Sequence, residues 1–151
     1  MTGPSVVDRF AVSEVLDDYA RGIDSKDWDL VCSVFTDDAS LDYTAFGGPV
    51  GVPQEVVDWI ASSTASFAMT QHHITNRHIT IDGDEAVCVS ELFAPMGTPN
   101  GDGKMSMLLT GGQYNDRLRR TEGGWKICSR VFEKAWMAVG PDATGPAGPK
   151  R

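Results

Sequence analysis

The hydrophobic pattern of this chain changes its period once, and that change limits the possible folds more than any other feature. Up to Phe67, most apolar residues recur every three or four positions, which is typical of amphipathic helices. From Met69 onward, the pattern favours strands separated by turns rich in Gly and Asp. Helices that come first and antiparallel strands that follow predict an α+β domain. A curved sheet wrapped around a helix can also enclose a pocket for a small molecule.

Breaks in this pattern place the individual elements. Ser5 can cap the first helix, a short second helix begins near Asp27, and Pro53 starts a third. The apolar stripe of the first helix comprises Val7, Phe10, Val15, Leu16, Tyr19 and Ile23. We expect strands over residues 39–46, 69–81, 85–96, 104–121 and 125–139. A bend is expected at Gly111-Gly112, and a flexible loop over 97–103.

The length of 151 residues fits one domain. We predict that this domain spans residues 1–139 and that residues 140–151, which are rich in Pro and Gly, form a mobile tail. The net charge of −8 disfavours nucleic acid and anionic membranes as partners, because both are negatively charged. Three cysteines, none of them in a CxxC pair, are more typical of buried thiols than of a disulfide framework. Without a secretory signal or a long apolar stretch, the sequence predicts a cytoplasmic protein.

Two polar residues stand beside apolar ones and are candidates for a site. Asp24 ends the first helix, where the negative helix terminus disfavours a carboxylate, and Tyr19 is close enough to flank the same opening. Arg130 shares a strand face with Cys128 and Phe132, which indicates a buried cation with a partner. The pattern alone leaves two plainer readings open, Asp24 as a solvated loop residue and Arg130 as half of a structural ion pair.

All three histidines occur in the segment that ends at His78. His72 and His78 share a face of the predicted strand, but they are about 20 Å apart along it, which is too far for two ligands of one metal ion. We therefore expect no metal site here, and the mechanism considered below needs no organic cofactor. The sequence contains no Walker loop and no GxGxxG, HExxH or GxSxG motif.

Four segments occur together in a known family. They are YARGIDSKDWDLVCSVFTDDASLDY (Tyr19 to Tyr43), TQHHITN (Thr70 to Asn76), IDGDEA (Ile81 to Ala86) and GGWKICSR (Gly123 to Arg130). In these segments the chain resembles the SnoaL-like branch of the nuclear transport factor 2 (NTF2)-like superfamily, over roughly residues 5–138. The resemblance implies an NTF2-like cone, in which N-terminal helices pack on a strongly curved, mostly antiparallel sheet that encloses a pocket. This fold hosts isomerases, dehydratases, cyclases, epoxide hydrolases and non-enzymes, so it specifies the reaction less well.

Within this family the chain most resembles three lyases, namely scytalone dehydratase, bile-acid 7α-dehydratase and hexachlorocyclohexane dehydrochlorinase. The resemblance implies that Asp24 and His72 form the Asp-His dyad that these enzymes share. Tyr19 stands where the bile-acid enzyme has a catalytic Tyr. Tyr43 matches a Tyr of scytalone dehydratase that binds substrate or water, and Arg130 matches an active-site Arg of the dehydrochlorinase.

The chain departs from these lyases on the sheet. Ser90 stands where scytalone dehydratase has a second His, and Tyr114 stands where it has a substrate-binding Asn. The strand Asp of the bile-acid enzyme has no clean match, and Ser90 and Glu91 are the nearest residues. We therefore expect a substrate different from those of the three lyases, and the departures put loss of water in particular in doubt.

These residues together predict general-base catalysis. Asp24 would fix the tautomer of His72, which would remove a proton from a carbon activated by a carbonyl or by elimination. Tyr19 and a second tyrosine would hydrogen-bond the developing oxyanion or the leaving group, and Arg130 would neutralise charge there or on a substrate carboxylate. The predicted contacts to a hydrophobic cyclic or polycyclic substrate are Tyr43, Tyr114 and Ser90, with apolar walls from Phe35, Trp59, Leu92 and Phe132.

Three functions fit this sequence. The first is a cofactor-free lyase, with a dehydratase-like elimination, or an isomerase. The second is a SnoaL-type polyketide cyclase or an epoxide hydrolase of secondary metabolism, although only Asp116 and Arg130 of the Asp-Arg-Asp set of such a hydrolase are present. The third is a non-catalytic protein that binds a small molecule, which the retained dyad disfavours.

Apolar residues on the strand faces predict a homo-oligomer, because the open face of such a sheet needs a cover. They are Met105, Met107, Leu109 and Val131. The three lyases are trimers and other branches are dimers, so the resemblance favours a trimer.

Overall fold

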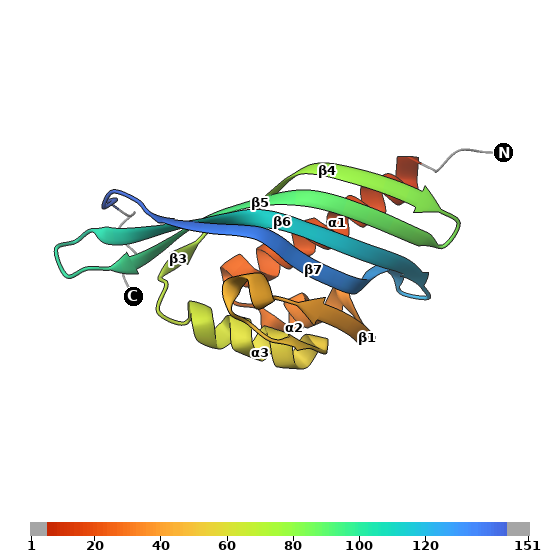
Figure 1. Ribbon diagram of the computed structural model, residues 1–151, viewed down its shortest axis with the longest axis horizontal. Helices are drawn as coiled ribbons and strands as arrows, with labels where there is room; N and C mark the ends of the chain where they lie inside the picture. Colours follow the sequence, from red (N-terminus) through yellow and green to blue (C-terminus); the bar gives the residue numbers. More distant parts are fainter. Residues whose placement is uncertain (1–5, 145–151) are drawn as a thin grey trace.

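The computed structural model describes residues 6–144, which form three helices packed against one large curved sheet (Figure 1). The helices are α1 (Val6–Ser25), α2 (Trp28–Ser33) and α3 (Pro53–Thr64). The strands are β1 (Phe35–Asp42), β2 (Val50–Gly51), β3 (Met69–Thr70), β4 (His73–Asp82), β5 (Glu85–Pro99), β6 (Met105–Thr121) and β7 (Gly124–Val139). The sheet order is β2-β1-β7-β6-β5-β3, and β4 pairs with another part of the β5 edge that β3 uses.

The sheet is mixed, although most of its pairs are antiparallel. β4, β5, β6 and β7 follow one another as antiparallel neighbours, whereas β1 runs parallel to β7. Parallel neighbours need a long connection between them, and here it comprises α3 and the whole of the antiparallel part. The predicted α+β class, with helices packed on a curved and mostly antiparallel sheet, is confirmed.

The apolar stripe of α1 packs into the core over most of the helix. The buried residues follow steps of three and four, and they are Val12, Leu16, Tyr19 and Ile23. The predicted stripe is wrong at its start, because Val7 and Phe10 are 74% and 67% exposed and precede the part of α1 that meets the core. The predicted cap, Ser5, lies outside the described residues. None of the described helices is both long and apolar enough to cross a bilayer.

The boundary between α2 and β1 differs from the prediction. The helix ends before Val34, and β1 begins at Phe35 rather than at residue 39. Phe35 pairs with Ile127 of β7, and the Ile127 N–H donates to the Val34 carbonyl at 2.9 Å. This pairing between distant parts of the chain outweighs the local helical spacing of apolar residues. The end of the predicted strand, Thr44–Phe46, forms a 3-10 turn.

The strand predicted over residues 69–81 is interrupted. It splits into β3 and β4, and Gln71 and His72 lie between them. The Gln71 N–H still donates to the Pro95 carbonyl of β5 at 3.1 Å, but the His72 N–H leaves the sheet ladder and donates to a side chain. The interruption therefore frees one backbone donor close to the helices.

The β5–β6 hairpin and the chain after β7 meet at one end of the sheet (Figure 1). β5 continues to Pro99, so the predicted loop over 97–103 begins as strand. After β7, Ala143 and Met105 form a β-bridge and exchange N–H···O bonds of 2.7 and 2.9 Å. The described beginning of the predicted tail therefore continues along the sheet, whereas residues 145–151 lie outside the described part.

The outward side chains of the sheet include exposed aromatic residues. Phe93 and Trp136 are 42% and 47% exposed and stack with their ring centroids 6.3 Å apart, and Phe93 also stacks on His73. Gly111 leaves room for the indole, because a Cβ at this position would come within 2.4 Å of Trp136. Val131, one of the residues behind the predicted interface, is 39% exposed. A homo-oligomer that covers these residues stays a prediction.

Candidate active site

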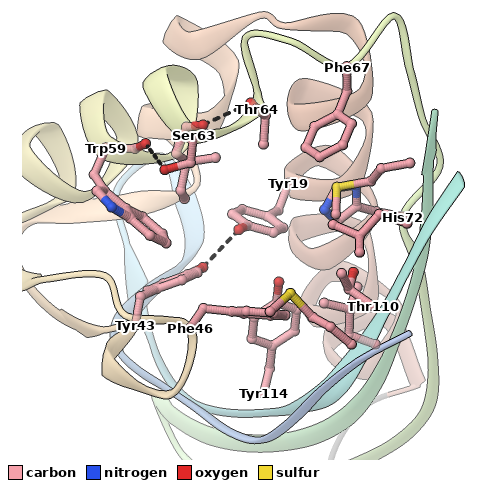
Figure 2. Close-up of a pocket in the computed structure, with 15 residues that line it drawn as sticks. Tyr19, Tyr43, Phe46, Trp59, Ser63, Thr64, Phe67, His72, Thr110 and Tyr114 are labelled. Carbon is pink, nitrogen blue, oxygen red and sulfur yellow. Dashed lines mark hydrogen bonds between the residues drawn. The ribbon is translucent and has the colours of Figure 1, made fainter. Parts of the chain in front are cut away.

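A cavity of about 280 Å³ lies between the helices and the sheet (Figure 2). Its lining is mostly aromatic or apolar, and it includes the predicted wall residues Trp59 and Leu92. No motif marks the other apolar residues of the lining, which are Phe46, Ile60, Phe67, Met96, Leu108 and Met137, and Ser63, Thr64 and Thr110 add hydroxyl groups. The cavity is therefore suited to a hydrophobic small molecule.

Asp24 and His72 form a hydrogen-bonded pair beside this cavity. The His72 Nδ1 lies 2.7 Å from the Asp24 Oδ1, and the His72 N–H donates to the Asp24 Oδ2 at 2.8 Å. The Thr70 hydroxyl donates to the Asp24 Oδ1 at 2.9 Å. The His72 ring lines the cavity with its side chain 10% exposed, and the Asp24 side chain is 28% exposed. Asp24 is thus engaged by three donors and is not a freely solvated loop residue.

The local structure explains how these residues meet. Asp24 lies in the last turn of α1, just before the chain reverses through Lys26, whose backbone φ is +56°. Thr70 ends β3, and the break after it turns the His72 N–H toward the carboxylate. The sequence gives no signal for Thr70, because threonine is common in strands.

The three donors keep the Asp24 carboxyl ionised. Burial raises the pKa of Asp24, but the hydrogen bonds from the His72 ring, the His72 N–H and the Thr70 hydroxyl together lower it more. The pKa of Asp24 therefore lies below its ordinary value of 3.8. An ionised carboxylate only accepts hydrogen bonds, so the His72 Nδ1 carries the proton between them. The other ring nitrogen, Nε2, is then free to accept a proton.

The three predicted tyrosines all line the cavity. The hydroxyl oxygens of Tyr19 and Tyr43 lie 2.7 Å apart (Figure 2), and the Tyr19 and Tyr114 rings meet edge to face at 5.8 Å. Each of the three is at most 4% exposed. Burial is the main cause that raises the pKa of Tyr19 and of Tyr43 well above the ordinary value of 10.0. These hydroxyls are therefore neutral hydrogen-bond donors at physiological pH.

Arg130 lies outside the lining of the cavity, and its surroundings correct its predicted role. Its side chain is 0% exposed, and its Nε and Nη2 donate to the two carboxylate oxygens of Asp116, both at 2.7 Å. The guanidinium carbon lies 4.2 Å from the ring centroid of Tyr19 and 4.0 Å from that of Tyr114. Because Asp116 neutralises its charge and two rings cover it, Arg130 is not placed to contact a leaving group or a substrate carboxylate.

Three other predicted contact residues also lie outside the lining. Ser90 is buried on β5 opposite Tyr114, and its hydroxyl has no hydrogen-bond partner within the part of the chain that the structure describes. Phe35 packs against Tyr19 at 6.0 Å, and Phe132 packs against Tyr114 at 4.9 Å. These phenylalanines are each 2% exposed, so they support the tyrosines from the core instead of forming the wall.

The remaining histidines and the cysteines add no second site. His73 and His78 are exposed on β4. Among the described residues, no group of three or more His, Cys, Asp or Glu side chains could hold a metal ion. All three cysteines are free, and burial, followed by the charge of Asp116, raises the pKa of Cys88 to about 11. The Cys88 thiol is therefore protonated at neutral pH.

Solved structures with a similar fold carry different names. A protein of Novosphingobium aromaticivorans, provisionally named an aromatic ring hydroxylase, has a TM-score of 0.78 at 25% identity, covering 91% of this chain and 96% of its own. A second protein of that organism, provisionally named a scytalone dehydratase, has a TM-score of 0.76 at 20% identity, covering 97% of both chains. A type 2 hexachlorocyclohexane dehydrochlorinase has a TM-score of 0.71 at 20% identity, covering 95% of this chain and 99% of its own. These likenesses show the fold but not the reaction.

Sequence comparison agrees with the structural likeness. An uncharacterised protein of Mycobacterium tuberculosis (strain ATCC 25618 / H37Rv) is 34% identical over 134 residues, which cover 89% of this chain and 90% of that protein. The model of the SnoaL-like domain family matches residues 4–131. The chain therefore belongs to the SnoaL-like family of the NTF2-like superfamily.

Proposed function

We propose that this protein is a cofactor-independent lyase or isomerase. In this proposal His72 is the general base that removes a proton from a carbon of a neutral, hydrophobic ring compound. The observation that carries the proposal is the pair at the cavity wall, in which the His72 Nδ1 lies 2.7 Å from the Asp24 Oδ1. The dehydratase and dehydrochlorinase names among the structural neighbours support it, because eliminations of this kind remove a proton from carbon.

The pair supplies what a general base needs. Asp24 holds the proton on Nδ1, so the Nε2 of His72 accepts the proton from the substrate carbon. The carboxylate then stabilises the imidazolium that forms, while remaining ionised itself. The tyrosine hydroxyls supply donors for the oxygen on which negative charge develops, or for a leaving group. Base and donors thus face one cavity, as proton transfer within a single bound molecule requires.

The lining of the cavity favours an uncharged substrate. Among the described residues that line it, none is Lys, Arg, Asp or Glu. The cation beneath the tyrosines, Arg130, already has its charge neutralised by Asp116. A charged group brought into this apolar space would lose its hydration without gaining a partner. A volume of about 280 Å³ suits a cyclic or fused-ring molecule.

The alternative functions differ in how well they fit the cavity. An epoxide hydrolase would need Asp116 and Arg130 at the substrate, but these two residues bind each other outside the lining. A polyketide cyclase would still need a base, and His72 is the one that lines the cavity among the described residues. A protein that only binds its ligand would need no base, and a measurement of proton transfer separates this alternative.

Hydrogen exchange at carbon tests the proposal without knowledge of the natural substrate. A panel of ring ketones, such as 1-tetralone, 2-tetralone and cyclohexanone, is incubated in D2O with the protein, and deuterium at the carbon beside the carbonyl is followed by NMR. We expect the protein to accelerate exchange of at least one ketone, and His72→Gln to lower this rate by about a hundredfold or more. His78→Gln is the matched control, because His78 is exposed on β4.

Two outcomes would contradict the proposal. A rate for His72→Gln within tenfold of the wild-type rate would exclude His72 as the base. Exchange no faster than in buffer, for every ketone of the panel, would instead favour the protein that only binds its ligand.

A further inference from the structure

The buried pair of Arg130 and Asp116 takes no part in the proton transfer proposed above, and stability alone explains it poorly. Asp116 lies on β6 directly opposite Arg130 on β7, and the two residues are 1% and 0% exposed. Taking two charges out of water is costly, and apolar residues of similar volume often stabilise a core as well or better. The contacts of the pair indicate what else it does.

The third guanidinium nitrogen of Arg130 reaches the tyrosine cluster. Its Nη1 donates to the Tyr43 hydroxyl oxygen in a long hydrogen bond of 3.4 Å. A guanidinium offers N–H donors and has no acceptor, so the Tyr43 oxygen accepts this bond. The cation repels the hydroxyl proton of Tyr43, which therefore points away from Arg130, and the Tyr19 oxygen lies 2.7 Å from the Tyr43 oxygen.

The cluster continues toward the cavity through Tyr114. The Tyr19 and Tyr114 rings meet edge to face with their centroids 5.8 Å apart. The contact between Tyr19 and Tyr43 uses one of their two hydroxyl protons in either direction, so the other proton is available to a molecule in the cavity. The Arg130 guanidinium lies over both rings, at 4.2 Å from Tyr19 and 4.0 Å from Tyr114, which fixes them against the cation. Arg130 therefore occupies an acceptor site of the cluster, and at least one hydroxyl proton is left for a ligand.

We propose that Arg130, held by Asp116, is a positioning residue that orients the hydroxyl protons of the tyrosine cluster toward the cavity. The cluster then selects a ligand whose buried polar group is a hydrogen-bond acceptor, such as a carbonyl oxygen, over one that lacks an acceptor. This inference rests on the proposed function, which it deepens: the carbonyl at the tyrosines belongs to the molecule that loses a proton to His72.

The composition of the chain makes the cluster easy to observe. The sequence has three tyrosines, and all three belong to the cluster, so tyrosine labelled with ¹³C at Cζ gives NMR signals from these hydroxyl-bearing carbons alone. The probes are 1-tetralone and tetralin, which share a fused-ring skeleton and differ in the carbonyl. Dissociation constants for both are measured by titration of the labelled protein.

Two double variants separate the proposed role from general damage. Arg130→Met with Asp116→Leu removes both buried charges and leaves no unpaired one. The matched control is Arg120→Met with Asp84→Leu, because Arg120 also lies over an aromatic ring, Trp125, at 4.5 Å and bonds Asp84, but on the surface. Circular dichroism and thermal unfolding verify that each variant is folded.

We expect the wild-type protein to bind 1-tetralone about tenfold more tightly than tetralin, the effect of one well-oriented hydrogen bond. This preference should fall below about threefold in the Arg130→Met, Asp116→Leu variant, and the Tyr43 Cζ signal should shift in the absence of a probe. The surface control should keep both the preference and the signal. If the double variant does not fold, Tyr43→Phe removes the hydroxyl that joins Arg130 to Tyr19 and should lower the preference to the same extent.

An unchanged preference in the folded double variant, or in Tyr43→Phe, would overturn the proposal. So would a wild-type protein without any preference for the ketone, whether it binds both probes or neither. Because these measurements need no turnover, they are separate from the test of His72. His72→Gln should keep the preference for the ketone even though it loses proton exchange.

Discussion

Two acid–base pairs stand beside the cavity, and their hydrogen bonds have the same length in very different surroundings. The His72 Nδ1 lies 2.7 Å from Asp24, and the Arg130 Nε lies 2.7 Å from Asp116. The side chains of the first pair are 10% and 28% exposed, whereas both side chains of the second are 0% exposed. The first pair presents a ring to the cavity, and the second is closed on itself behind aromatic rings.

This contrast teaches that the partner of the carboxylate and its access to the cavity decide what a pair can do. An imidazole changes its charge near neutral pH and has a second nitrogen free for a substrate. Burial disfavours the charged form of Arg130, but Asp116 and the neighbouring tyrosines outweigh it and raise the pKa of Arg130 well above its ordinary value. Arg130 is therefore a fixed charge that can orient neighbouring groups but cannot exchange protons with a substrate.

The largest effect should come from removing one member of the buried Arg130–Asp116 pair. Arg130→Met leaves Asp116 without its partner at 1% exposure, and we expect the free energy of unfolding to fall by about 3–5 kcal/mol. Urea unfolding followed by circular dichroism measures this loss.

The double variant Arg130→Met with Asp116→Leu should recover most of that stability, because no buried charge is left unpaired. Arg120→Met, at a partly exposed residue, should lower the stability much less than Arg130→Met does. A loss of unfolding free energy below about 1 kcal/mol for Arg130→Met alone would contradict the burial of the Arg130–Asp116 pair, because it would mean that water reaches Asp116.

A change in the Asp24–His72 pair, which faces the cavity, should affect activity more than stability. Asp24→Asn keeps one acceptor oxygen, which can still accept from the His72 N–H. Its NH2 group then faces the Thr70 hydroxyl and the His72 Nδ1, so it no longer holds a proton on that nitrogen. We expect the exchange of ketone protons to slow by about a hundredfold, which corresponds to about 2.7 kcal/mol. The free energy of unfolding should fall by only about 1 kcal/mol.

Nitrogen NMR of the labelled imidazole provides the mechanistic readout for this variant. The wild-type ring should carry its proton on Nδ1, and Asp24→Asn should shift the population toward the Nε2 tautomer. Asp17→Asn is the matched control, since Asp17 is also on α1 but pairs with Arg77 near the surface. Exchange within tenfold of wild type, with the tautomer unchanged, would show that the carboxylate does not govern His72.

The fold was predictable to the extent that local pattern controls it. The change from helical to strand period gives the α+β class, and α3 begins at Pro53 as expected. The errors at Phe35 and at His72 have a common cause, because both depend on contacts with residues far along the chain. Phe35 pairs with β7, and the His72 N–H donates to Asp24 of α1, so neither boundary can be found from neighbouring residues.

The candidate site was less predictable from the residues alone. Spacing left Asp24 open as a solvated residue, and only the family resemblance joined it to His72. The mutual position of Asp116 and Arg130 depends on the β6–β7 register, which contains two irregularities. The one between Gly111 and Gln113 lies at the bend expected from the glycine pair, but no sequence pattern marks the one between Arg117 and Leu118. Arg130 could therefore be recognised as a buried cation, but its partner and its distance from the ligand could not.

The smallest effect, absent at neutral pH, should come from the tyrosines that separate the two pairs. Burial is the first cause that raises the pKa of Tyr19, Tyr43 and Tyr114 above 10.0 in the folded chain. A group with a raised folded-state pKa contributes stability that is fully present below its unfolded pKa, here about 10, and is lost as the pH rises further. We expect the tyrosinate absorbance of the folded protein to stay flat through pH 10 and to appear only with unfolding, whereas the chain in guanidinium chloride titrates near 10. A tyrosinate signal in the folded protein below about pH 10 would mean that water reaches the cluster. The Asp24–His72 and Asp116–Arg130 pairs would then no longer differ in their access to water.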